Sequence, residues 1–351
     1  MINNELPDRK VREMIEKEPC VNMLIEAGAG SGKTTSMVNR MISLLVSGKC
    51  RVENVAAITF TRKAAQELKE RFQNELEKRY RREENDGVRD RLKEALNNIE
   101  NCFIGTIHSF CASLLRERPV EGAVDPNFEE IDELNNMLLH NHAWQQYLLD
   151  VRKDYPEKLS GLNAVGIKPS DLEGIYRFIT RYPDVEIVRN ETPKPDLSPA
   201  VDKLKRILYR AKNYIPKEEP ENGYDKLQTN ILETVRMLAY FDMNIETNKV
   251  NILEKFENEQ KVTLKKWLCD GDKTKSIQDE FRYLSQTEIK PALRQWREYC
   301  HYIAMDFLLP GVEYYERLKN KQSGLNYQDL LLKAVNMLKN HPEVRLYFQD
   351  K

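Results

Sequence analysis

The chain has 351 residues, of which 55 are Lys or Arg and 56 are Asp or Glu, so its formal net charge is −1. This balance excludes a strongly basic overall field, and any contact with a polyanion must come from local placement of charge. A mean hydropathy of −0.66 and 32% charged residues are typical of a soluble, helix-rich protein. No segment approaches eighteen consecutive apolar residues and residues 1–5 do not begin a signal peptide, so we expect a cytoplasmic protein without a membrane segment.

The first informative segment is a glycine-rich loop between an expected strand and an expected helix. The apolar residues 21–25 predict a buried strand, and residues 27–34 then read Ala-Gly-Ala-Gly-Ser-Gly-Lys-Thr. Apolar residues recur with helical spacing over residues 37–45, before a stop at residues 47–48. The backbone N–H groups of such a loop, and the positive end of the following helix, converge on phosphate oxygens.

This loop departs from the general G-x-x-x-x-G-K-[ST] pattern only at Ala27. A glycine-rich turn without a ligand is the weaker alternative. Lys33 would reach the terminal phosphates of a nucleotide, and Thr34 would hold Mg²⁺. The candidate nucleotide-binding residues are Ala27, Gly28, Ala29, Gly30, Ser31, Gly32, Lys33, Thr34 and Thr35.

Two further strand-to-helix transitions follow. Residues 55–58 predict a second strand, after which Thr61 can cap a helix. Residues 102–105 predict a third strand, which leads into a helix that begins near Thr106. The apolar faces comprise Ala65, Leu68, Phe72 and Leu76 in the first helix and Ile107, Phe110, Cys111, Leu114 and Leu115 in the second.

Each of these strands ends in hydroxyl and basic or imidazole side chains. In open α/β sheets ligands collect at the carboxyl ends of strands, so we expect these groups to share one edge with the phosphate loop. Hydroxyls and cations there suit the backbone of a polyanion. Taken singly, Thr61 is simply a cap and His108 a polar residue at a helix start. The candidate residues for binding such a polyanion are Thr59, Thr61, Arg62, Lys63, Thr106 and His108.

The rest of the chain is predicted to be mainly helical, with breaks at residues 189–195 and 217–223. We expect Trp144, Trp267 and Trp296 to anchor its core, and His140 and His142 to lie on a solvated helix. The cysteines show no C-x-x-C pair, so reduced, buried thiols are expected and Thr34 is the one metal ligand assigned. These cysteines are Cys20, Cys50, Cys102, Cys111, Cys269 and Cys300.

Together the three motifs resemble the superfamily 1 helicases of the UvrD type. Residues 27–34 look like the first motif of that family, and residues 59–65 look like its motif that grips single-stranded DNA. Residues 106–111 are similar to the Thr-x-His-x-Phe-Cys form of the RecB and AddA branch, which Thr35 also fits. Residues 8–15 align with the family's adenine-recognition motif, but Val11 stands where a glutamine is usual, so adenine selectivity is not predicted.

The resemblance implies an α/β plus α fold: a partial P-loop (RecA-like) parallel sheet of about three strands, followed by a large, mainly α-helical insertion. The first part, subdomain 1A, would span residues 1–120. A 1B-like insertion would span residues 121–351 and return toward 1A near residues 324–351. The implied function is that of the N-terminal part of an ATP-dependent DNA helicase or translocase, moving 3′ to 5′ in repair or recombination. Its ligands would be ATP, Mg²⁺ and single-stranded or partly duplex DNA, with a RecC- or AddB-like partner subunit.

The hydrolytic carboxylates of the family lie on a strand that ends in Asp-Glu-x-Gln-Asp. The look-alike here, residues 278–282, follows the polar residues 274–277 and is expected to be a charged helix face rather than a buried strand. Residues 1–351 are therefore expected to bind ATP and DNA weakly without turnover. Two alternatives stay open: another P-loop enzyme such as a kinase or GTPase, and a non-catalytic, helicase-like binding module.

Overall fold

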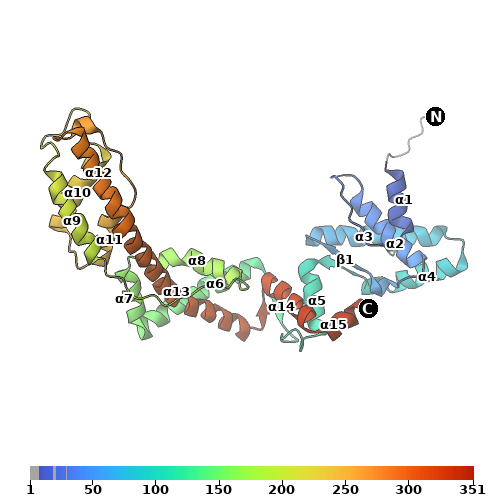
Figure 1. The fold of residues 1–351 in the computed structure, drawn as a ribbon. Helices are drawn as coiled ribbons and strands as arrows, with labels where there is room; N and C mark the ends of the chain where they lie inside the picture. Colours follow the sequence, from blue (N-terminus) through green and yellow to red (C-terminus); the bar gives the residue numbers. More distant parts are fainter. Residues whose placement is uncertain (1–7, 19–20, 29) are drawn as a thin grey trace. The chain divides into compact units, whose positions relative to one another are not determined.

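The fold is that of a computed structural model, which describes residues 8–18, 21–28 and 30–351. Residues 1–7, Pro19, Cys20 and Ala29 lie outside the described residues. The chain divides into two compact units. The first unit comprises Met1–Asp132 and Ser323–Lys351, and the second comprises Glu133–Gln322. The described residues are mostly helical, with two small parallel sheets (Figure 1).

The first unit contains both sheets, each of two strands, and its helices are labelled in Figure 1. Its elements before the insertion are α1 (Arg9–Lys17), α2 (Lys33–Val46), β1 (Ala56–Thr59), α3 (Arg62–Arg82), α4 (Asp86–Asn97), β2 (Phe103–Thr106), α5 (Ile107–Glu117) and β3 (Glu129–Glu130), with short 3-10 turns at Val52–Asn54 and Ile99–Asn101. After the insertion come β4 (Gly324–Leu325), α14 (Tyr327–Asn340) and α15 (Pro342–Asp350).

The first sheet joins β1 and β2 in parallel, with Ala56 opposite Phe103 and Thr59 opposite Thr106. The strands predicted at residues 55–58 and 102–105 are therefore confirmed, each displaced by one residue. Helices α2, α3 and α4 pack together beside this sheet around a buried apolar cluster. The predicted apolar face of α3 is buried at Ala65, Leu68, Phe72 and Leu76.

The strand predicted at residues 21–25 is wrong for this structure. These residues have no regular secondary structure, and the side chain of Leu24 is 90% exposed. A strand needs a neighbour for its N–H and C=O groups, and among the described residues β1 and β2 pair only with each other. The carbonyl of Val21 instead accepts a hydrogen bond from Arg40 Nη2 at 2.7 Å. The sheet thus has two strands rather than the expected three.

The second sheet brings together parts of the chain that are far apart in sequence. Glu129 of β3 lies opposite Gly324 of β4, and Glu130 lies opposite Leu325. Beside it, α5 packs against α14, and the two share a buried apolar cluster that includes Leu115, Leu330 and Met337. The return segment is therefore an integral part of the first unit (Figure 1).

The second unit is helical throughout its described elements. Two of the three tryptophans, Trp267 and Trp296, are buried in its larger cluster, and Trp144 is buried against Tyr147 and Tyr176. The prediction that these tryptophans anchor the core is confirmed. The elements are α6 (Glu133–Asp154), α7 (Pro156–Ala164), α8 (Pro169–Arg181), α9 (Ser198–Lys212), α10 (Lys226–Tyr240), α11 (Glu246–Glu254), a 3-10 turn (Leu264–Lys266), α12 (Gly271–Leu284), a π-helical turn (Ser285–Ile289) and α13 (Lys290–Lys321).

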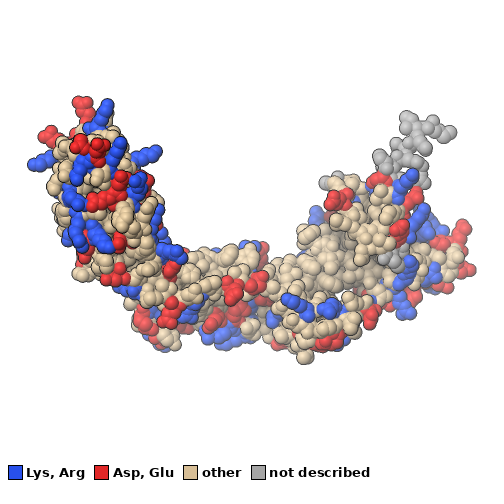
Figure 2. All heavy atoms as spheres, in the orientation of Figure 1, with Lys and Arg blue, Asp and Glu red and all other residues tan. Residues whose placement is uncertain are grey.

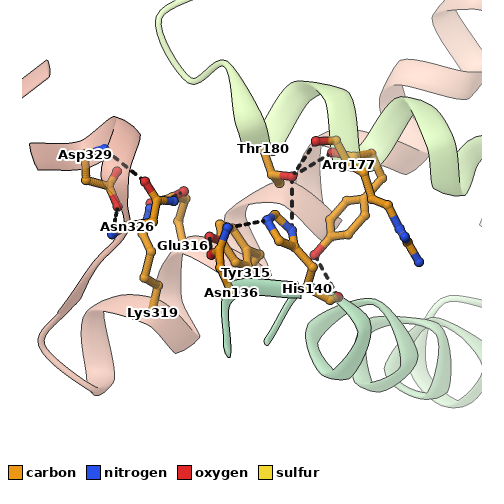
Figure 3. Close-up of polar contacts among 10 residues, drawn as sticks. Asn136, His140, Arg177, Thr180, Tyr315, Glu316, Lys319, Asn326 and Asp329 are labelled. Carbon is orange, nitrogen blue, oxygen red and sulfur yellow. Dashed lines mark hydrogen bonds and ion pairs between the residues drawn. The ribbon is translucent and has the colours of Figure 1, made fainter. Parts of the chain in front are cut away.

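The expectation that His140 lies on a solvated helix face is wrong. His140 is only 8% exposed, and its ring stacks on Tyr315 with the ring centroids 4.0 Å apart (Figure 3). Nδ1 of His140 lies 3.1 Å from Thr180 Oγ1, so this nitrogen has a partner from another helix. Burial, with the nearby charge of Lys319, lowers the pKa of His140 to about 4. His142, two residues later on α6, is exposed as predicted.

The charged face predicted for residues 278–282 is confirmed as helix, because these residues lie within α12. Asp279 pairs with Arg282, and Glu280 pairs with Arg210, at the surface of the second unit. Figure 2 shows Lys and Arg interspersed with Asp and Glu over the visible face of this unit. None of the helices in the described part of the chain combines the length and apolar character needed to cross a membrane.

Candidate functional site

The glycine-rich loop leads into the N-terminus of α2. Gly30 and Gly32 have φ angles of 75° and 88°, in the left-handed region that L side chains rarely adopt. Gly32 is the N-cap residue and carries no side chain to occupy the first N–H groups of the helix. No acidic residue lies in the first turn of α2. The loop therefore ends at a helix N-terminus whose partial positive charge has no local counter-charge on that turn.

Lys33 lies over this loop. Its Nζ donates hydrogen bonds to the carbonyl oxygens of Ala27 at 2.6 Å and Gly28 at 2.8 Å. The Ser31 hydroxyl donates to the same Gly28 oxygen at 2.8 Å. Lys33, Thr34 and Thr35 are exposed. The lysine charge and the threonine hydroxyls are therefore open to a ligand at the start of α2.

Helix α1 contacts the loop through Arg12, a residue to which sequence reasoning gave no role. Arg12 Nη2 donates to the carbonyl oxygen of Ser31 at 2.6 Å and to Asp8 Oδ2 at 2.8 Å. The hydrogen bond from Arg12 lowers the pKa of the Asp8 carboxyl. Val11, next to Arg12, has 58% of its surface exposed. The alignment of residues 8–15 with a nucleotide motif was the signal that could have pointed to Arg12.

The loop residues fit a nucleoside triphosphate with a bound divalent cation. Two left-handed glycines keep the backbone free of Cβ atoms at the helix start, and a Cβ on Gly28 or Gly30 would meet no atom within 4 Å. Lys33 provides a cation whose ammonium group already donates hydrogen bonds to two carbonyl oxygens of the loop. The exposed Thr34 hydroxyl is a hard oxygen ligand of the kind Mg²⁺ prefers.

The carboxyl ends of β1 and β2 lie side by side, as predicted, because Thr59 is opposite Thr106 in the parallel register. The Thr59 hydroxyl donates to the carbonyl of Thr61 at 3.1 Å. Thr61 and Thr106 are the N-caps of α3 and α5, and their Oγ1 atoms accept from Ala64 N at 3.1 Å and from Ser109 N at 3.2 Å. Since residues 21–25 form no strand, the structure does not extend this edge to the phosphate loop.

A groove of about 500 Å³ opens at this edge of the first unit. It brings together three of the predicted residues, Arg62, Thr106 and His108, whereas Thr59, Thr61 and Lys63 are not among the residues that line it. Its acidic member, Glu130, is paired with Arg116 at 2.9 Å. The lining residues are Phe60, Arg62, Ala65, Gln66, Lys69, Ile104, Gly105, Thr106, His108, Ser109, Glu130 and Tyr327.

Sequence reasoning gave no binding role to the other nine lining residues, three of which add side-chain chemistry to the groove. Phe60 is 98% exposed, and the Thr-Phe-Thr sequence at a strand end was the signal that could have identified it. Lys69 lies two helical turns after Arg62 on α3 and adds a second cation. Tyr327 comes from the return segment, and its ring stacks on His108 with the centroids 4.6 Å apart and the planes 27° apart. Such a long-range pairing has no signal in the local sequence.

Comparisons with known proteins give consistent results. The model of the UvrD/REP helicase N-terminal domain family matches residues 8–351. An ATP-dependent helicase/nuclease subunit of Staphylococcus haemolyticus is 24% identical over 84% of this chain and 26% of its own length. The subunit of the same name from Limosilactobacillus reuteri is 32% identical over 40% of this chain and 10% of its own. The exonuclease/helicase subunit RexA of Lactococcus lactis is 34% identical over 39% and 12%. The matched part of the chain spans about a quarter or less of the length of these relatives.

Proposed function

Because the chain belongs to the UvrD/REP helicase N-terminal domain family, we propose that it is the ATP- and DNA-binding N-terminal part of an ATP-dependent DNA helicase. The observation that carries this proposal is the pairing of two sites in the first unit: a phosphate loop with Lys33 at a helix N-terminus, and a groove with cations, hydroxyls and an exposed aromatic ring. The first unit would be the RecA-like P-loop subdomain 1A, and the second unit the helical 1B insertion.

In the proposed nucleotide site, the N–H groups of residues 28–32 and the first turn of α2 bind phosphate oxygens. Lys33 exchanges its loop carbonyls for the terminal phosphates, which are stronger, charged acceptors. Thr34 and Thr35 lie at the same helix start, where Thr34 would hold Mg²⁺. Mg²⁺, when bound, neutralises charge that develops on the phosphates during transfer. Arg12 ties α1 to Ser31 and so keeps the loop in its curved form.

In the proposed DNA site, Arg62 and Lys69 pair with phosphates, and the hydroxyl of Thr106 and the ring nitrogens of His108 supply further hydrogen bonds. Thr61, which caps α3 beside the groove, would add its hydroxyl at the rim. The fully exposed ring of Phe60 offers a face on which a base can stack, whatever the base is. Thr59 and Lys63, which lie near the carboxyl end of β1, would contact the DNA backbone beside the groove. Such contacts carry no base information, so binding would be indifferent to sequence.

The relatives are named ATP-dependent helicase/nuclease subunits, and this supports a role of the intact protein in DNA repair or recombination. By the same family resemblance, we propose 3′ to 5′ movement, a partner subunit like AddB or RecC, and action in the cytoplasm. Within residues 1–351 the Asp-Glu pair at residues 279–280 lies on α12 and not on a strand beside the loop. We therefore propose that residues 1–351 alone bind Mg-ATP and single-stranded DNA without DNA-stimulated turnover.

The nucleotide assignment is tested by Lys33→Ala, with Lys93→Ala as a matched control. Lys93 is an exposed lysine on α4, outside the loop and the groove. Loss of charge-assisted hydrogen bonds worth about 1.5–3 kcal/mol predicts that Lys33→Ala binds a fluorescent ATP analogue at least about tenfold more weakly. Lys93→Ala should bind like the parent chain. Equal affinity for Lys33→Ala and the parent chain would refute the assignment of Lys33.

A further inference from the structure

His108 lies in the first turn of α5, two residues after the Thr106 cap. Its side chain is partly exposed to the groove, and no hydrogen bond from another described residue holds its ring. The contact that orients it is the stack on Tyr327, at 4.6 Å between centroids. Stacking uses the faces of the two rings, so both nitrogens at the edge of His108 stay free to bond a ligand.

Tyr327 itself is held at a well-fixed point of the backbone. It is the first residue of α14, and the residue before it, Asn326, forms a capping box with Asp329. Asp329 N donates to Asn326 Oδ1 at 2.9 Å, and Asn326 N donates to Asp329 Oδ2 at 3.0 Å. Immediately before this box, β4 pairs with β3. Hydrogen bonds therefore fix the backbone on both sides of Tyr327, whose ring lines the groove.

The stack lies at the edge of the packing that joins α5 to α14, because Tyr327 is one of the partly buried residues that pack against this apolar cluster. That packing comes from fully buried side chains, among them Leu115, Leu330 and Met337. Tyr327 and His108 are only half-buried, and both line the groove. The stack therefore lies where this packing meets the groove.

We propose that Tyr327 is a positioning residue for DNA binding, and that its ring holds His108 with the polar edge of the imidazole toward a phosphodiester in the groove. This inference rests on the proposed function, because it assumes that single-stranded DNA occupies the groove. It deepens that function by giving the return segment, more than 200 residues after α5 in sequence, a direct part in the DNA site.

The test uses residues 1–351 and a fluorescein-labelled oligothymidylate, with anisotropy measured at low, fixed salt. Tyr327→Phe keeps the ring and should bind within about twofold of the parent chain. Tyr327→Leu and His108→Ala should each weaken binding by about threefold to tenfold, the range that one hydrogen bond typically contributes in net terms at a solvent-accessible site. The double variant should be no weaker than the weaker single variant, because both remove the same interaction.

Thermal unfolding and affinity for the ATP analogue serve as folding controls, and Tyr327→Met replaces Tyr327→Leu if the latter does not fold. Parental binding by the folded Tyr327→Leu or Tyr327→Met variant, or additive effects in the double variant, would overturn the positioning role while leaving the DNA site intact. Failure of the parent chain to bind the oligonucleotide would instead refute the proposed DNA site.

Discussion

Replacing Gly32 with alanine tests whether the observed curvature of the loop is the binding-competent one. Gly32 has a φ of 88°, and a Cβ there would lie 3.0 Å from Nη1 of Arg12. An L residue in the left-handed region costs about 1–2 kcal/mol, and the guanidinium must also move. The loop before α2 is exposed and has no strand to hold it, so the alanine variant can relax out of this conformation. The cost then falls on ligand binding rather than on overall stability.

This cost corresponds to about a fivefold to thirtyfold loss of affinity for a fluorescent ATP analogue, since 1.4 kcal/mol is a factor of ten. The unfolding midpoint in urea should change little. Gly174→Ala is the matched control: it adds the same methyl group within α8, where no atom lies within 4 Å, and should leave ATP affinity unchanged. Parental affinity in the Gly32→Ala variant would show that the loop binds phosphate in another conformation, or not at all.

Two further predictions follow from the groove and from the buried histidine. Replacing Arg62 and Lys69 together with alanine should flatten the slope of log affinity against log salt by about one to two units, whereas Lys93→Ala, outside the groove, should leave the slope unchanged. Equal slopes in the parent chain and both variants would contradict the assignment. For His140, with a folded pKa of about 4 and an unfolded value near 6.5, the unfolded chain binds the proton first as pH falls. The parent should therefore lose about 3 kcal/mol of unfolding free energy between pH 6.5 and pH 4 that His140→Gln does not lose, as measured by urea titration; identical losses would refute the linkage.

Local signals in the sequence were enough to predict the elements that carry the groove. The Thr61 cap, the strands before Thr61 and Thr106, and the apolar faces of α3 and α5 depend on residues close in sequence, and each was predicted. The three motifs at these positions also identified the family, and the match over residues 8–351 confirms it. Features that depend only on neighbouring residues, such as a helix cap or an apolar helix face, were therefore predicted correctly.

Features that depend on distant partners could not be predicted in this way. Residues 21–25 have the composition of a strand, but a strand forms only where a neighbour supplies hydrogen bonds. His140 has a polar local sequence, yet its ring is buried by Thr180 and Tyr315 from other helices. The stack of Tyr327 on His108 likewise depends on how the chain returns after the second unit.

The discontinuity of the first unit has a consequence for synthesis on the ribosome. β3 emerges long before its partner β4, because residues 131–323 must be translated between them. At about 5–20 residues per second this takes roughly 10–40 s. The contiguous second unit is complete before α14 exists, while the apolar face of α5 around Leu115 still lacks Leu330 and Met337. The nascent first unit therefore exposes an apolar surface for tens of seconds, and a chaperone would bind this surface during that interval.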